Sequence, residues 1–184
     1  MAAEPAGSAR SVVADAKAAS TSVVRRATLI VHDLDASRRF YRDVLGFEVW
    51  LENNGKVTAD SLPSEAPLGA PSRFLIMKGK HPWIGMIGLL EFTAPRLPAP
   101  PRRERLGIGD IVFVMQGDDV EGVHARAVAQ GARIHAPPHR FEVTGADGSH
   151  LVMSSLSLWD PDDYFIEYNQ RLSVIPGKSN QGAP

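Results

Sequence analysis

Residues 26–47 read Arg26-Ala-Thr-Leu-Ile-Val-His-Asp-Leu-Asp-Ala-Ser-Arg-Arg-Phe-Tyr-Arg-Asp-Val-Leu-Gly-Phe47, and they predict the order of the first elements of the fold. The first six residues form a mainly apolar run that is typical of a β-strand. Asp33 follows, and its carboxylate can accept a hydrogen bond from a first-turn amide of a helix. Phe40 and Val44 then lie on one helical face, and Gly46 stands where a left-handed residue would end the helix. The stretch therefore predicts a strand, a helix and a second strand that begins near Phe47.

The rest of the chain repeats this arrangement. Glu91 lies in Leu-Leu-Glu-Phe and Glu167 lies in Phe-Ile-Glu-Tyr, which are matching apolar settings. Glu91 and Glu167 each lie near the end of one copy of a repeated unit. Each copy opens with an apolar strand that is followed by a helix-like stretch. The opening strand begins at Arg26 in the first copy and at Asp110 in the second. The repeat predicts that Arg26 is equivalent to Asp110 and that Glu91 is equivalent to Glu167.

Alternation along the first strand of each copy assigns side chains to faces. Successive side chains of a strand point to opposite sides, so Arg26 is expected to share a face with Thr28 and to oppose Leu29. Asp110 is expected to oppose Phe113 in the same way. Both polar residues are therefore predicted on the face turned away from the apolar residues.

The order of elements predicts an α+β fold of two tandem β-α-β-β-β modules. We expect a flexible leader over residues 1–22 and a first module over 23–94. Pro95, Pro98, Pro100 and Pro101 exclude a helix or a central strand, so residues 95–105 are predicted to form a linker. The second module is predicted over 106–171 and a flexible tail over 172–184. Within the first module, the Gly- and Pro-containing residues 53–71 are a candidate lid or a surface insertion.

Composition narrows the function classes. The formal net charge of −1 argues against a nucleic-acid partner, because such proteins usually carry a basic excess. The chain has no cysteine, which excludes disulfides, thiolate nucleophiles and zinc sites built on sulfur. No apolar run reaches the roughly 18 residues of a membrane span. We expect a cytoplasmic protein, and export behind a signal peptide that precedes this chain is the alternative.

The stretch at 26–47 resembles the opening of the vicinal oxygen chelate superfamily, and Asp160-Pro-Asp-Asp-Tyr-Phe-Ile-Glu167 resembles its closing motif. This superfamily includes glyoxalase I, extradiol dioxygenases and bleomycin-resistance proteins. The resemblance implies that the two modules form a cup-shaped mixed sheet. It also implies a divalent metal held by side chains from the first and last strands of each module.

Carried over residue by residue, the resemblance places Arg26 and Asp110 at positions that are commonly His or Gln, and Glu91 and Glu167 at the carboxylate positions. An arginine cannot ligate a cation, because its guanidinium stays protonated and has no lone pair. Two interpretations remain open. In one, Glu91, Asp110 and Glu167 hold Mg²⁺, Mn²⁺ or Ca²⁺ in preference to Zn²⁺ or Ni²⁺, and Arg26 binds the substrate. In the other, Arg26 replaces the metal and pairs with the carboxylates.

The function predicted from this resemblance is glyoxalase-like. A small oxygen-rich molecule, carbonyl or anionic, would be bound or converted in the cup, with Arg26 as the substrate-binding residue. In a lyase- or isomerase-type enzyme, Glu91 or Glu167 would transfer the proton. The alternatives are a binding or sequestering protein of the resistance type and a structural homodimer with an inert cup. A homodimer is also compatible with the first two functions.

The histidines are secondary candidates. Two prolines separate His135 from His139, so a helix that would place both rings on one face is excluded and a loop is expected. His81 and His150 lie near strands that enter the predicted cup. Either could replace the missing ligand or act as an acid-base group.

Overall fold

A computed structural model describes residues 22–145 and 148–175 of the chain. The first half contains β1 (Arg26–Ile30), α1 (Leu34–Arg39), the π-helical segment η1 (Phe40–Val44), β2 (Glu48–Lys56), β3 (Pro71–Lys78) and β4 (Met86–Phe92). The second half contains β5 (Val112–Gly117), α2 (Val120–Ala129), β6 (Arg133–Thr144), β7 (His150–Trp159) and β8 (Phe165–Ile175). Within the described residues, no helix is long and apolar enough to span a membrane.

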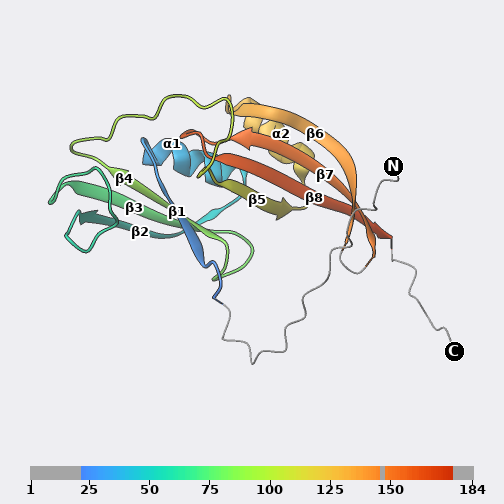
Figure 1. Ribbon diagram of the computed structural model, residues 1–184, viewed down its shortest axis with the longest axis horizontal. Helices are drawn as coiled ribbons and strands as arrows, with labels where there is room; N and C mark the ends of the chain where they lie inside the picture. The colour runs from blue at the N-terminus through green and yellow to red at the C-terminus, as the bar shows by residue number, and fades with distance from the viewer. Residues whose placement is uncertain (1–21, 146–147, 176–184) are drawn as a thin grey trace, which may run out of the picture.

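The two halves have the same topology. The first four strands form a sheet in the order β1-β4-β3-β2, and the last four form a sheet in the order β5-β8-β7-β6. In both sheets the first and last strands of the half pair in parallel, and the other neighbours pair antiparallel. Figure 1 shows the first sheet on the left and the second on the right. The prediction of an α+β fold with two β-α-β-β-β modules is confirmed.

The predicted helix signals act as expected. Asp33 is the N-cap of α1, and its side chain accepts hydrogen bonds from the amides of Asp35 and Ala36. Asp119 caps α2 through the amide of Gly122. Both helical segments are followed by a glycine in the left-handed region, Gly46 at φ +77° and a second glycine after α2. These local signals set where each helix begins and ends.

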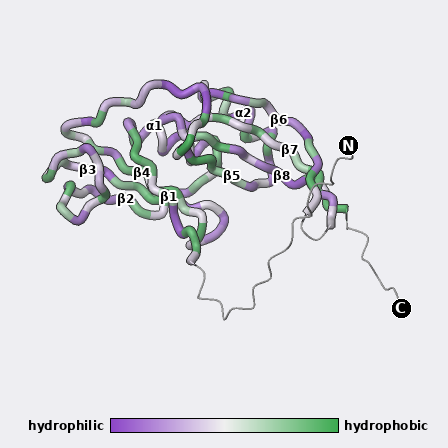
Figure 2. The backbone as a smooth tube through the Cα atoms, viewed as in Figure 1, coloured by the Kyte–Doolittle hydropathy of each residue, from purple (hydrophilic) through white to green (hydrophobic). Residues whose placement is uncertain are grey.

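One hydrophobic core joins the modules. Each sheet has a helix face, which packs against α1, η1 or α2, and an open face on its other side. Leu29 and Leu89 on the helix face of the first sheet and Leu156 and Ile166 on that of the second belong to the same buried cluster. Figure 2 shows that the strands and helices at the centre include hydrophobic segments, whereas part of the stretch between β4 and β5 is hydrophilic. Burial of this cluster is the main stabilising contribution to the fold.

The open faces of the two sheets do not form one cup within the chain. Each sheet turns its helix face toward the shared core, so both open faces point away from it. Among the strands that the structure describes, none of the first sheet pairs with one of the second. A cup that uses both open faces would therefore need a second copy of the chain.

Two predicted boundaries shift, and one predicted loop is a strand. The strand expected from Asp110 begins at Val112, because the residues before it form a turn. The segment around His135 and His139 is not the expected loop but belongs to β6, at a sheet edge where prolines are tolerated. The tail was expected from residue 172, but β8 continues to Ile175, which pairs with His150 at the start of β7. The leader, apart from its last residue, and the rest of the tail lie outside the described residues.

The loop between β2 and β3 packs against part of the first sheet. Val57, Ala66 and Ala70 form a small buried cluster with Phe92 of β4. Phe92 lies on the open face, two residues beyond Leu90. The loop therefore covers the open face at the end of β4.

Candidate functional site

The turn between β7 and β8 joins the two modules. Asp160 is only 4% exposed and accepts a hydrogen bond of 3.0 Å from the hydroxyl of Tyr41 in the first module. It also accepts from the amides of Asp162 and Tyr164, at 2.9 and 2.8 Å. Burial raises the pKa of the Asp160 carboxyl from 3.8 to about 7, although the three donors favour its ionised form. Asp160 is therefore a structural joint with a titratable group at its centre.

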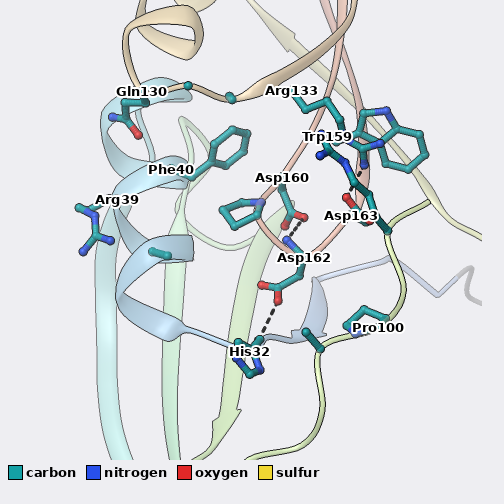
Figure 3. A pocket seen from close by; sticks show the side chains of 16 residues that line it. His32, Arg39, Phe40, Pro100, Gln130, Arg133, Trp159, Asp160, Asp162 and Asp163 are labelled. Atoms are coloured by element: carbon teal, nitrogen blue, oxygen red, sulfur yellow. Dashed lines mark hydrogen bonds and ion pairs between the residues drawn. The ribbon is translucent and has the colours of Figure 1, made fainter. Parts of the chain in front are cut away.

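The next two acids strengthen the same joint (Figure 3). Asp162 accepts from the backbone amide of His32 at 2.8 Å and from the hydroxyl of Ser37 at 3.1 Å, both in the first module. Asp163 adopts φ +65°, a conformation that aspartate tolerates better than most residues. It accepts from the amide of Arg103 and forms an ion pair with Arg133. The Asp-Pro-Asp-Asp motif thus connects both modules and the segment between them.

Arg26 lies on the open face of the first sheet, as predicted. Its Nε donates to the Thr28 hydroxyl at 3.1 Å, and its guanidinium carbon lies 5.2 Å from the centre of the Phe74 ring. A Cβ at Gly88 would lie 2.8 Å from the Thr28 hydroxyl and 3.2 Å from Cδ of Arg26, so glycine allows this close packing. In the described part of the chain, the terminal nitrogens of Arg26 have no hydrogen-bond acceptor. This guanidinium is held by its neighbours and remains available to an anion or a carbonyl oxygen.

Glu91 lies on the other side of the same sheet. It is 1% exposed, and its carboxylate contacts Arg73 at 3.4 Å and Arg96 at 3.2 Å. Arg73 in turn forms a hydrogen bond of 2.9 Å with Asp35 on α1. Glu91 therefore belongs to an ion-pair network beside the helix and does not share a face with Arg26.

Strand register explains this placement. Leu29 pairs with Leu89 in the first sheet, as Phe113 pairs with Ile166 in the second. The structural counterpart of Glu167 is therefore Leu90, and Glu91 lies one residue further along β4. An offset of one residue moves a side chain to the opposite face of a sheet.

Asp110 lies in the turn that precedes β5. Its carboxylate accepts from the amide of Gly107 at 2.7 Å and forms an ion pair with Arg103. It also lines a cavity of about 350 Å³ between the modules, together with Glu65 and Tyr164. Both of its oxygens already contact donors from the preceding segment, so Asp110 fixes this turn.

Glu167 lies on the open face of the second sheet, half-buried, where it pairs with Val114 and with Ser157. Its carboxylate accepts a hydrogen bond of 2.9 Å from the side-chain amide of Asn169. A carboxylate only accepts, so the nitrogen of this amide must face it. The Asn169 oxygen is consequently buried without a partner among the described residues.

Sequence reasoning missed the polar row around Glu167. Ser155 is 4% exposed, Ser157 and Asn169 are both 8% exposed, and all three share the face of Glu167. The signal was present in the alternating Ser-Ser-Leu-Ser-Leu-Trp of β7, where alternate residues are polar. Buried polar groups on one face of a sheet need partners.

The structure does not bring the side chains at the four family positions together within one chain. Arg26 lacks a lone pair, Glu91 lies on a different face, and Asp110 is held in a turn. Across residues 22–145 and 148–175, no three His, Asp or Glu side chains are placed to hold a metal ion together. Of the four, only Glu167 offers a carboxylate to an open face, and one carboxylate alone does not satisfy a hard divalent cation.

The secondary histidine candidates lie apart from these residues. His81 accepts from the amides of Trp83 and Ile84 in its own loop. His150 is exposed at the start of β7. His135 contacts the ring of Phe165 at the start of β8, with 5.5 Å between the ring centres.

Comparisons with known proteins agree with the fold. The family model of the Glyoxalase/Bleomycin resistance protein/Dioxygenase superfamily matches residues 23–168, so the chain belongs to this superfamily. A glyoxalase family protein from Bacillus cereus is 15% identical, with a TM-score of 0.65 over 85% of this chain and 99% of that one. A glyoxylase/bleomycin resistance protein/dioxygenase domain from Frankia is 18% identical, with a TM-score of 0.56 over 83% and 99%.

The trypanothione-dependent glyoxalase I of Leishmania major is also similar. It is 18% identical, with a TM-score of 0.52 over 82% of this chain and 87% of that one. A search of curated proteins found no match. At these identities the structural likenesses show the fold, and the activity has to be argued from the site.

Proposed function

We propose that the protein binds a small oxygen-rich molecule between two copies of the chain, through Arg26 of one copy and Glu167 of the other, without a metal at the four family positions. The main support for this proposal is that the terminal nitrogens of Arg26 lie on the open side of the first sheet and have no acceptor among the described residues. An arginine held in this way favours a carboxylate or carbonyl oxygen of a ligand.

The open face of the second sheet supports the other half of the proposed site. Glu167 presents a carboxylate beside the buried Ser157, and Asn169 has an oxygen without a partner among the described residues. These groups are mainly acceptors, because the Asn169 amide nitrogen already donates to Glu167. They would accept hydrogen bonds from hydroxyl or amine groups of a ligand, whereas Arg26 would donate hydrogen bonds to the acceptor oxygens of the same ligand.

Two features favour a second copy as the partner that brings these faces together. β1 and β5 are both edge strands, so each presents unpaired backbone groups. Ile30 on β1 is 37% exposed and Val114 on β5 is 67% exposed, and both lie on open faces. Pairing of β1 with β5 of another copy would cover these apolar side chains and place Arg26 and Glu167 in one cup.

A complementation experiment tests ligand, residues and arrangement together. Wild-type protein is screened by thermal shift with a panel of small hydroxy and keto carboxylates, and hits are quantified by calorimetry. We expect Arg26→Gln and Glu167→Gln to weaken binding at least about tenfold, because each loses a charged contact. Arg140→Gln, which changes the charge of an exposed arginine on β6, is the matched control and should bind like wild type.

Co-expression then separates the two-copy arrangement from a single-chain site. A mixed dimer of Arg26→Gln and Glu167→Gln chains contains one site with both substitutions and one site with neither. We expect it to recover tight binding at about half of the wild-type stoichiometry. Failure of every panel member, wild-type binding by Arg26→Gln, or no recovery in the mixed dimer would contradict the proposal.

A further inference from the structure

A second cavity lies where the two modules and the segment between them meet. It has a volume of about 530 Å³ and is lined by α1, by residues 99–102, by the end of α2 and by the turn between β7 and β8. Figure 3 shows Arg39 and Gln130 on one side of it and Arg133 and Trp159 on the other. Small-molecule sites usually occupy roughly 300–1,000 Å³. Neither Arg26 nor Glu167 lines it, so this cavity is separate from the proposed site on the open faces.

The acids of this cavity are already engaged by the protein. In each of Asp160, Asp162 and Asp163, both carboxylate oxygens accept a hydrogen bond or take part in an ion pair with another protein group. Burial also raises the pKa of the Asp160 carboxyl to about 7 and raises the pKa of the Asp162 carboxyl above its ordinary value. These acids hold the walls together, and they offer little capacity to bind a cation.

Two of the cationic side chains remain without such partners. Arg39 at the end of α1 and Arg102 in the connecting segment both line the cavity. Within the described residues, neither guanidinium forms a hydrogen bond or an ion pair, although Arg39 lies near enough to Asp35 to lower the pKa of that carboxyl. Arg133, by contrast, is paired with Asp163. The free hydrogen-bonding capacity of the cavity is therefore mainly that of cationic donors.

Apolar surfaces complete the lining. Phe40 and Trp159 are both 4% exposed, and Pro161 adds a third apolar side chain from the turn between β7 and β8. Ala36 and Ala132 have small side chains that leave the space open. The exposed Pro161 and the half-buried Ala36 supply most of the apolar surface open to a ligand, Phe40 and Trp159 form the base behind them, and charged groups would fix the orientation of the ligand.

We infer that the cavity between the modules is a second small-molecule site, which takes an anion such as a carboxylate or phosphate attached to an aromatic or apolar body. Arg39 and Arg102 bind the anionic group from two different elements. The apolar body packs against Pro161 and the small exposed part of Phe40. Because both modules and the connecting segment supply the lining, an occupant contacts all three at once.

Paired probes test this site. 1-Naphthoate carries the anion and an aromatic body, and 1-naphthamide is its neutral analogue. Calorimetry on the full chain is expected to show that 1-naphthoate binds more tightly. A variant with both Arg39→Gln and Arg102→Gln should bind 1-naphthoate at least about tenfold more weakly than wild type. Its affinity for 1-naphthamide should be unchanged. Ala36→Phe should weaken both probes, because its ring fills the cavity.

Two control variants define the location. Arg140→Gln removes an exposed arginine that does not line the cavity, and Arg26→Gln alters the open-face site. Both should bind 1-naphthoate within about twofold of wild type. No 1-naphthoate binding, equal affinity for the two probes, or an equal loss in Arg140→Gln would overturn the inference. A loss confined to Arg26→Gln would assign the probe to the open face and also overturn it.

Discussion

Replacing Asp160 with asparagine removes a loss of stability that the wild-type protein undergoes as the pH rises from about 4 to about 7. Burial raises the folded-state pKa of Asp160 from 3.8 to about 7. Below about pH 4 the carboxyl is neutral in both states. Between these pH values the unfolded chain releases the proton and the folded chain keeps it, so the free energy of unfolding falls as the pH rises.

Above about pH 7 the Asp160 carboxyl is ionised in both the folded and the unfolded state, so the decrease in the free energy of unfolding becomes constant. Since one pKa unit is worth about 1.4 kcal/mol, the loss attributable to Asp160 is on the order of 4 kcal/mol. The Asp160→Asn variant keeps a side-chain oxygen for the amides of Asp162 and Tyr164, so it should fold. Denaturant unfolding of both proteins across pH 4–8 measures the difference. Parallel pH profiles would contradict the account of this joint.

Glu91→Ala should destabilise the protein strongly, whereas Glu167→Ala should not. Glu91 is buried between Arg73 and Arg96, and its loss leaves a cavity and removes one of the carboxylates that neutralise Arg73 beside the helix. We expect a decrease in the free energy of unfolding of about 2–4 kcal/mol, or roughly 5–12 °C in Tm. Glu167 is half-buried on an open face, and its replacement should change stability by less than about 1 kcal/mol.

Glu91→Gln is the shape-matched variant, and it should lie between wild type and Glu91→Ala because it keeps volume and loses charge. Thermal unfolding of the three variants and the wild type at one pH measures these differences. Equal effects of Glu91→Ala and Glu167→Ala, or a stable Glu91→Ala, would show that Glu91 does not hold the first sheet to its helix.

The fold was predictable because its signals are local. The helix start at Asp33 and the glycine at 46 depend on neighbours in sequence, and the structure places both as predicted. The face of Arg26 follows from alternation within β1 alone. The repeated strand and helix order then defines the modules without any long-range contact.

The site was less predictable because it depends on register between strands. Glu91 and Glu167 match in sequence, yet β1 pairs with β4 so that Leu90, and not Glu91, corresponds to Glu167. The partners Arg73 and Arg96 of Glu91 also come from other elements. Asp110 looked like a strand residue, but a hydrogen bond from Gly107 places it in a turn. Such contacts are set by tertiary packing and are not visible in a local pattern.

In the proposed open-face site, Arg26 takes the place of a metal at the family's ligand positions. Elemental analysis of protein purified without chelator or metal affinity, followed by thermal unfolding during titration with Mn²⁺, Ni²⁺ and Zn²⁺, tests it most directly. We expect less than about 0.1 metal ion per chain. Any change in Tm that the added metals cause should be the same in wild type and in Glu167→Ala. One metal ion per chain, with a stabilising titration that is lost in Glu167→Ala, would contradict the claim and restore a chelate site.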